Sequence, residues 1–119
     1  MLRALREIRE HGLRTAALTN NWHSGDGSQM GTHHPEMVAL FDLVVESAVE
    51  GLRKPDPRIY ELVCARLGVE PQESVFLDDL GVNLKTARAL GMTTIKVGDP
   101  AVALAELETV LGFGLVPAP

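Results

Sequence analysis

Residues 52–97 read LRKPDPRIYELVCARLGVEPQESVFLDDLGVNLKTARALGMTTIKV, and this stretch decides the fold. It places Lys54 in front of a proline, continues through a helical pattern, and reaches Asp78 and Asp79 at the end of the apolar run 75–77. Two adjacent carboxylates repel each other, and they do so more strongly where water is scarce. Because a divalent cation such as Mg²⁺ relieves that repulsion, the acidic pair is a candidate metal site.

Short apolar runs alternate with helical patterns along the chain. Asp56 and Pro57 predict a helix start and Gly68 predicts its end. Strands separated by helices indicate a parallel sheet with helices on both faces, a three-layer Rossmann-like α/β fold. We expect one domain, with a core over residues 1–112 and a tail over 113–119. The expected strands are 14–19, 43–46, 74–77 and 93–97, and the expected helices are 2–11, 35–40, 57–67, 81–90 and 100–111, with a loop over 20–35.

Composition narrows the class of protein. The chain has 119 residues, is 45% apolar and carries a net charge of −5, which argues against a nucleic-acid surface. No apolar run approaches the roughly 20 residues that span a bilayer, and the first residues resemble neither a signal nor a transit peptide. The single Cys64 has no internal disulfide partner, which suits a reducing compartment. We therefore expect a cytoplasmic protein without a membrane anchor.

Polar side chains follow the predicted strands where they end. Thr19 and Asn20 close the first strand, Lys54 lies in the connection after the second, and Asp78 and Asp79 close the third. In open α/β sheets, ligands bind beyond the carboxyl ends of the strands. A hydroxyl and backbone amides hold phosphate oxygens, a lysine neutralises them, and a carboxylate holds a metal. Together these groups predict a phosphoryl-transfer site.

Three segments, LTNN, RKPDP and FLDDLGVNLKTARALGM, resemble in order three of the four motifs of the haloacid dehalogenase-like (HAD) superfamily. The resemblance covers about residues 2–112. It implies a Mg²⁺-dependent phosphatase-type hydrolase that cleaves a phosphorylated small molecule, a phosphomonoester, through an aspartyl-phosphate. Dehalogenase chemistry also occurs in the superfamily, although the acidic pair favours phosphate.

The resemblance also implies a role at each matching position. Thr19 and Asn20 would bind phosphoryl oxygens, and Lys54 would bridge the phosphate and the nucleophile. Asp79 would coordinate Mg²⁺, with Asp78 beside it as a ligand or as a hydrogen-bond acceptor behind the metal.

Asn83 completes the implied site, where it would orient the two carboxylates. At this position a polar residue on a helix surface is an equally good interpretation.

The family's nucleophile motif, Asp-x-Asp, occurs nowhere in these 119 residues. Neither Asp42 nor Asp26 lies in a suitable context to replace it. We expect the nucleophile strand and the helical cap to lie upstream of Met1, so that the chain alone is inactive. A complementing N-terminal chain, or a homo-oligomer formed through an open sheet edge, would be its partner. The alternative is a non-catalytic phosphate- or Mg²⁺-binding regulatory module that acts through a partner chain.

The missing strand has a structural consequence. The family sheet has the order 5-4-1-2-3, so the absent strand is the central one. Without it, strands 14–19 and 74–77 either pair directly, giving the order 5-4-2-3, or receive a strand from another chain. Unpaired buried backbone groups cost about 1–3 kcal/mol each, so we expect direct pairing when the chain is alone.

Each feature also has a plainer interpretation. The acids 78–79 could cap a helix, Lys54 could be a solvated turn residue, and residues 19–20 could simply end a strand. The histidines and glycines of the loop 20–35 match neither a closed zinc site nor a dinucleotide-binding loop, and the role of Trp22 stays open. The histidines are His23, His33 and His34. A phosphorelay receiver domain is a further α/β alternative, but its phosphoacceptor aspartate is missing.

Overall fold

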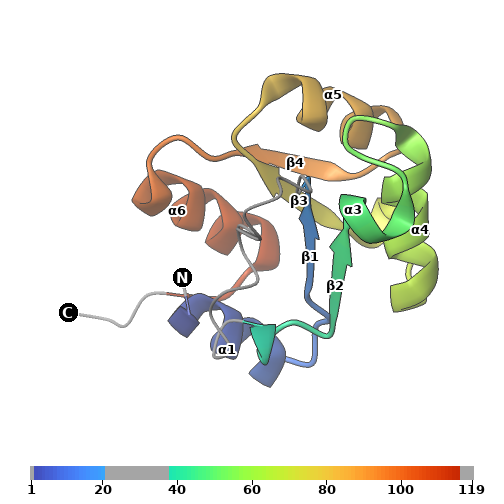
Figure 1. Cartoon of the computed structure of the whole chain (residues 1–119). Helices are drawn as coiled ribbons and strands as arrows, with labels where there is room; N and C mark the ends of the chain where they lie inside the picture. The colour runs from blue at the N-terminus through green and yellow to red at the C-terminus, as the bar shows by residue number, and fades with distance from the viewer. Residues whose placement is uncertain (1, 21–37, 116–119) are drawn as a thin grey trace, which may run out of the picture.

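The computed structural model describes residues 2–20 and 38–115 (Figure 1). The elements in chain order are α1 (Leu2–Glu10), β1 (Ala16–Thr19), β2 (Leu43–Glu46), α3 (Ser47–Glu50), α4 (Pro57–Leu67), the 3-10 helix η1 (Pro71–Glu73), β3 (Val75–Asp78), α5 (Gly81–Ala89), β4 (Thr93–Lys96) and α6 (Pro100–Leu111). The alternation of strands and helices confirms the predicted α/β class. No sequence pattern predicted α3 or η1, and most of the predicted loop 20–35 and helix 35–40 lies outside the described residues, as do Trp22, His23, His33 and His34.

Local sequence signals set the ends of the longer helices. The Asp56 side chain accepts a hydrogen bond from the Arg58 amide, Pro57 opens α4, and Gly68 ends it with a φ of 73°. The same type of N-terminal cap begins α6, where the Asp99 side chain accepts a hydrogen bond from the Ala101 amide. These boundaries agree with the sequence prediction because a cap and a glycine depend only on neighbouring residues.

The strands form two separate parallel pairs. β1 pairs with β2 and β3 pairs with β4, each over four residues. Within the described residues no ladder joins β1 to β3, so the expected direct pairing of these strands is wrong. At their carboxyl ends the Lys54 side chain lies between Asn20, which follows β1, and Asp78, which ends β3. Side-chain contacts, this one and the apolar packing of Val45 with Phe76 in one cluster, join the two pairs in place of a backbone ladder.

Two apolar clusters cover opposite sides of the strands. One gathers side chains of α4 and α5 around Val45, and the other gathers side chains of α1 and α6 around Ile95. In β3, Phe76 joins the first cluster while Val75 and Leu77 join the second, as the alternation of a strand requires. Figure 1 shows α4 and α5 on one side of the strands and α6 and α1 on the other. The result is the three-layer arrangement.

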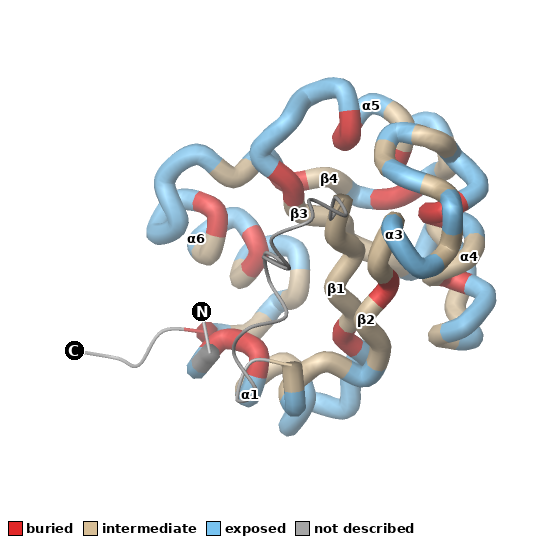
Figure 2. Tube along the Cα trace, viewed as in Figure 1, coloured by how far each residue is buried: buried red, intermediate tan, exposed pale blue. Residues whose placement is uncertain are grey.

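The strands in the middle of the fold are less buried than is usual for such an arrangement. All four residues of β1, and residues 75–77 of β3, are only half-buried (Figure 2). Parallel strands with helices on both faces are normally buried throughout. β2 is half-buried at three of its four residues and β4 has two exposed ones, so partial exposure is shared by all four strands.

Residues 113–115 of the predicted tail pack against the core. Leu115 is buried in the cluster around Ile95, and its amide donates to a Glu108 carboxylate oxygen. The Phe113 ring stacks on His11 with 3.6 Å between the ring centroids. No helix within residues 2–20 and 38–115 has the length and apolar character to cross a membrane.

The packing predicts a large cost for opening a cavity under α4. Ile59 is fully buried, so Ile59→Ala should lower the free energy of unfolding by about 2–5 kcal/mol. Urea denaturation followed by circular dichroism measures it. The control is Val102→Ala in α6, where the side chain is 56% exposed and the loss should stay within about 0.5 kcal/mol. Equal losses in the two variants would contradict the described core.

Candidate functional site

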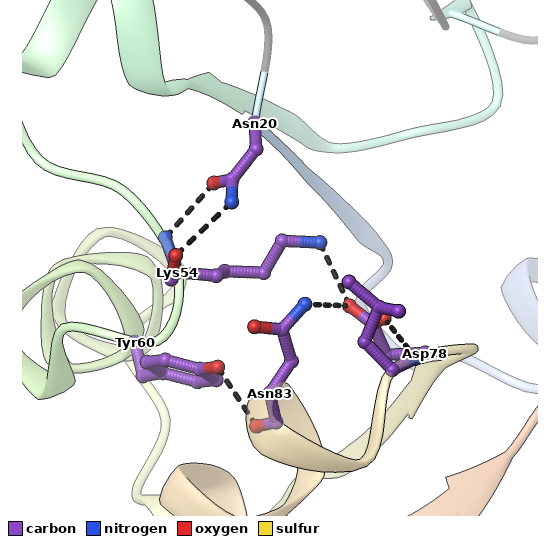
Figure 3. Close-up of polar contacts among 6 residues, drawn as sticks. Asn20, Lys54, Tyr60, Asp78 and Asn83 are labelled. Atoms are coloured by element: carbon purple, nitrogen blue, oxygen red, sulfur yellow. Dashed lines mark hydrogen bonds and ion pairs between the residues drawn. The ribbon is translucent and has the colours of Figure 1, made fainter.

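The site begins with a double hydrogen bond that fixes the backbone at Lys54. The Asn20 amide nitrogen donates to the Lys54 carbonyl at 3.1 Å, and the Lys54 amide donates to Asn20 Oδ1 at 2.8 Å. Asn20 directly follows β1, so this pair of bonds ties the connection after α3 to the end of β1 (Figure 3). The Asn20 side chain thereby sets where the lysine side chain starts.

From that fixed backbone, Lys54 reaches the end of β3. Its Nζ lies 2.8 Å from Asp78 Oδ2, and the two side chains are only 13% and 6% exposed. The ammonium also lies over the Phe76 ring, 5.9 Å from its centroid. Removing both charges from water is costly, so the pair must be held by further contacts.

Asp78 receives those contacts from the start of α5. The Leu80 amide donates to Oδ1 at 2.9 Å, and Asn83 Nδ2 donates to Oδ2 at 3.2 Å. Burial alone would raise the pKa of Asp78, but the hydrogen bonds from Lys54, Leu80 and Asn83 hold that pKa below its ordinary value. Oδ2 accepts two bonds and Oδ1 accepts one, which leaves a lone pair on Oδ1.

The predicted site residues fall into two groups. Asn20, Lys54, Asp78 and Asn83 form one connected network. Asp79 is exposed beside that network, and Thr19 is the half-buried last residue of β1. Within the described part of the chain, no hydrogen bond joins Asp79 or Thr19 to the network. Asn83 donates to Asp78, and the predicted orienting, ligand and phosphate-binding roles remain predictions.

Sequence reasoning missed Tyr60. Its side chain is 1% exposed, and its hydroxyl donates to the Asn83 carbonyl at 2.8 Å. Burial and the nearby Asp78 charge raise the pKa of Tyr60 to about 12. The signal was available in part, because a tyrosine on the apolar face of α4, close after the RKPDP segment, needs a partner for its hydroxyl.

The donor set limits which metal the site can hold. Among residues 2–20 and 38–115 no group of three or more His, Cys, Asp or Glu side chains gathers. Asp79 and the spare lone pair of Asp78 are hard oxygen donors. Mg²⁺ commonly binds one or two protein carboxylates and completes its shell with water and phosphate, so this donor set fits Mg²⁺ better than zinc.

Comparison with known proteins identifies the family. A model of haloacid dehalogenase-like hydrolases matches residues 1–91, and the chain belongs to this family. It is 51% identical over 115 residues to acyl-CoA dehydrogenase family member 10 of Mus musculus, covering 97% of the chain and 10% of that protein. It is 46% identical over 122 residues to bifunctional epoxide hydrolase 2 of Sus scrofa, covering 100% of the chain and 22% of that protein. The chain therefore spans only a small part of both relatives.

A shorter relative and two solved structures complete the comparison. The chain is 34% identical over 112 residues to a sesquiterpene phosphatase of Aspergillus oryzae, covering 94% of the chain and 56% of that protein. An uncharacterized protein of Corynebacterium glutamicum has the same fold, with a TM-score of 0.79 at 21% identity, over 94% of this chain and 81% of that one. A HAD family enzyme of Bacteroides thetaiotaomicron, an Asp-to-Ala mutant in complex with magnesium and inorganic phosphate, superposes with a TM-score of 0.63 at 28% identity, over 83% of this chain and 52% of that one.

Breaking the buried ion pair should be costly and pH-dependent. Lys54→Met leaves Asp78 without its cation and should lower the free energy of unfolding at neutral pH by about 3–5 kcal/mol. The native pKa of Asp78 is depressed, so its ionisation stabilises the fold above the unfolded-state pKa of roughly 3.9, and this contribution is lost as the pH falls through the native value. In the variant the deficit should therefore shrink at acidic pH. Urea denaturation of both proteins at neutral and at acidic pH measures this deficit.

The matched control is Arg66→Met. It breaks the pair between Arg66 and Glu50, whose side chains are 42% and 17% exposed. We expect a much smaller loss there. A Lys54→Met deficit that is equally small, or that does not change with pH, would contradict the described ion pair.

Proposed function

We propose that this chain supplies the phosphate- and Mg²⁺-binding part of a phosphatase-type active site. The observation that carries the proposal is the buried Lys54–Asp78 pair at the carboxyl ends of the strands. Buried, paired ionisable groups of this kind cluster at functional sites. The substrate class is a phosphorylated small molecule, and the reaction is hydrolysis of a phosphomonoester.

Lys54 is the group that receives the phosphate. Its ammonium has three N–H donors, and Asp78 accepts one of them. The other two are available to phosphoryl oxygens, with the Thr19 hydroxyl at the end of β1 as a further donor. Because Asn20 fixes the Lys54 backbone and Asp78 holds its tip, the ammonium is already ordered before substrate arrives.

Asp79 is the principal metal ligand in this proposal. It is exposed next to the network, whereas the oxygens of Asp78 already accept three hydrogen bonds. Asp78 either binds the metal through its remaining lone pair on Oδ1 or accepts a hydrogen bond from a group that binds the metal. Bound Mg²⁺ would supply charge neutralisation for the phosphoryl group. The related enzyme of Bacteroides thetaiotaomicron, which binds magnesium and inorganic phosphate, supports this choice of metal.

The proposed reaction needs a nucleophilic carboxylate that this network does not offer. Asp78 is engaged by Lys54, Leu80 and Asn83, and we assign Asp79 to the metal. We propose that a further parallel strand, from another segment or chain, lies between β1 and β3 and brings an Asp-x-Asp sequence to Lys54. The lack of a ladder between β1 and β3 within the described residues supports this position. Without that strand we expect no phosphatase activity.

Complementation tests the missing strand. We expect the chain alone not to hydrolyse p-nitrophenyl phosphate in the presence of Mg²⁺. Adding a fragment with an apolar strand that ends in Asp-x-Asp should restore hydrolysis, and the matched Asn-x-Asn fragment should not. If the unmixed chain were active and Asp79→Ala abolished that activity, the proposal that the chain needs a further strand would be rejected. Binding of inorganic phosphate without any recovery of activity would favour a non-catalytic binding module.

Metal binding separates Asp79 from other exposed acids. In an NMR titration with Mg²⁺, Asp79→Asn should weaken binding at least about tenfold, because it removes the charge of the main ligand. Asp99→Asn is the control, since an asparagine caps α6 as well as the aspartate does and lies outside the network. Equal Mg²⁺ affinity in wild type and Asp79→Asn would reject this ligand assignment.

A further inference from the structure

Tyr60 contacts the site from beneath, through the first turn of α5. Its hydroxyl crosses from α4 to the Asn83 carbonyl, and the contact is fully buried (Figure 3). The Asn83 side chain in turn donates to Asp78. Tyr60 is thus linked to Asp78 through Asn83 and makes no direct hydrogen bond to Asp78 among the described residues.

The start of α5 lacks the usual means of fixing a helix end. Leu80 occupies the N-cap position, and no side-chain cap bond forms there. Leucine is a poor N-cap because it has no oxygen to accept from the first amides. The described bonds that reach this turn from outside the helix are those of Tyr60 and Asp78. These bonds hold the turn from outside the helix, although they do not cap the first amides of α5.

Aromatic contacts hold the Tyr60 ring, and with it the hydroxyl, in one position. The Tyr60 ring meets Phe76 edge to face, with 5.2 Å between the centroids, and Phe76 lies under the Lys54 ammonium. With a pKa near 12 the hydroxyl stays protonated at physiological pH, so it always donates. A rigid ring and a permanent donor can therefore hold the turn in one place.

We propose that Tyr60 is a positioning residue of this site: its hydroxyl fixes the first turn of α5, so that the Leu80 amide and the Asn83 amide both meet Asp78 in the geometry that binds Mg²⁺. The proposal rests on the proposed function for its metal. Both donors to Asp78 belong to the same turn, so a shift of that turn moves them together. A displaced Asp78 carboxylate would also change its distance to the Lys54 ammonium.

A double-mutant cycle tests whether Tyr60 acts through Asn83. In NMR titrations with Mg²⁺, Tyr60→Phe should raise the dissociation constant about three- to tenfold, the range expected for one lost hydrogen bond. Asn83→Ala should raise it as well, and in that background Tyr60→Phe should add little. The control is Ser74→Ala, which removes a hydroxyl bond to the Glu70 carbonyl beside the opposite end of β3 and should leave the Mg²⁺ affinity unchanged. Unchanged affinity in Tyr60→Phe, or the same effect with and without Asn83, would overturn the proposal.

A metal-free readout separates this proposal from the proposed function. In wild type the Asn83 side-chain amide should exchange slowly with water, because Asn83 is 3% exposed and bonded to Asp78. In Tyr60→Phe that exchange should accelerate several-fold, while urea denaturation shows that the variant is folded. If wild type fails to bind Mg²⁺, the proposed function fails and the exchange rate alone decides on Tyr60. Equal exchange rates in the two proteins would then reject the positioning role.

Discussion

The buried ion pair between Lys54 and Asp78 is the interaction on which the rest of this structure depends. Burying two charges costs more than their attraction returns unless other groups also hydrogen-bond them. Here Asn20 fixes the lysine backbone, and the first turn of α5 supplies two donors to the carboxylate. The pair also links the ends of β1 and β3, which share no ladder. This ion pair therefore lies at the centre of the site and also joins the two strand pairs at their carboxyl ends.

The adjacent acids Asp78 and Asp79 have opposite environments, and this difference determines what each can do. Asp78 ends β3 with its carboxylate inside the network and its hydrogen-bonding capacity nearly used. Asp79 is exposed. Sequence alone shows two equivalent carboxylates that repel. The fold pairs one with the lysine and exposes the other to solvent, which lowers the repulsion that adjacency would otherwise create.

Features that depend on neighbours in sequence were predictable, and features that depend on a distant side chain were not. Asp56, Pro57 and Gly68 define α4 through local geometry, and the strand ends place Lys54 near the acids because parallel strands end at one edge. The lack of a ladder between β1 and β3, and the contact that brings Lys54 to Asp78, involve residues far apart in sequence, and the short α3 has no side-chain cap that would predict it. Tyr60 followed the apolar pattern of its helix, which predicts burial but does not name the carbonyl that its hydroxyl meets.

The missing ladder between β1 and β3 and the remaining donors of Lys54, both as seen within residues 2–20 and 38–115, are two aspects of one arrangement. β1 and β3 carry apolar side chains that remain half-buried in the middle of the fold, where helices cover parallel strands on both faces. The lysine between their ends has two N–H groups beyond the one that Asp78 accepts. A strand that paired with both β1 and β3 would bury their apolar side chains. It would also bring hydrogen-bond acceptors to the Lys54 ammonium. The same segment would thus complete the core and the site, so the proposed function couples folding of the sheet to assembly of the site.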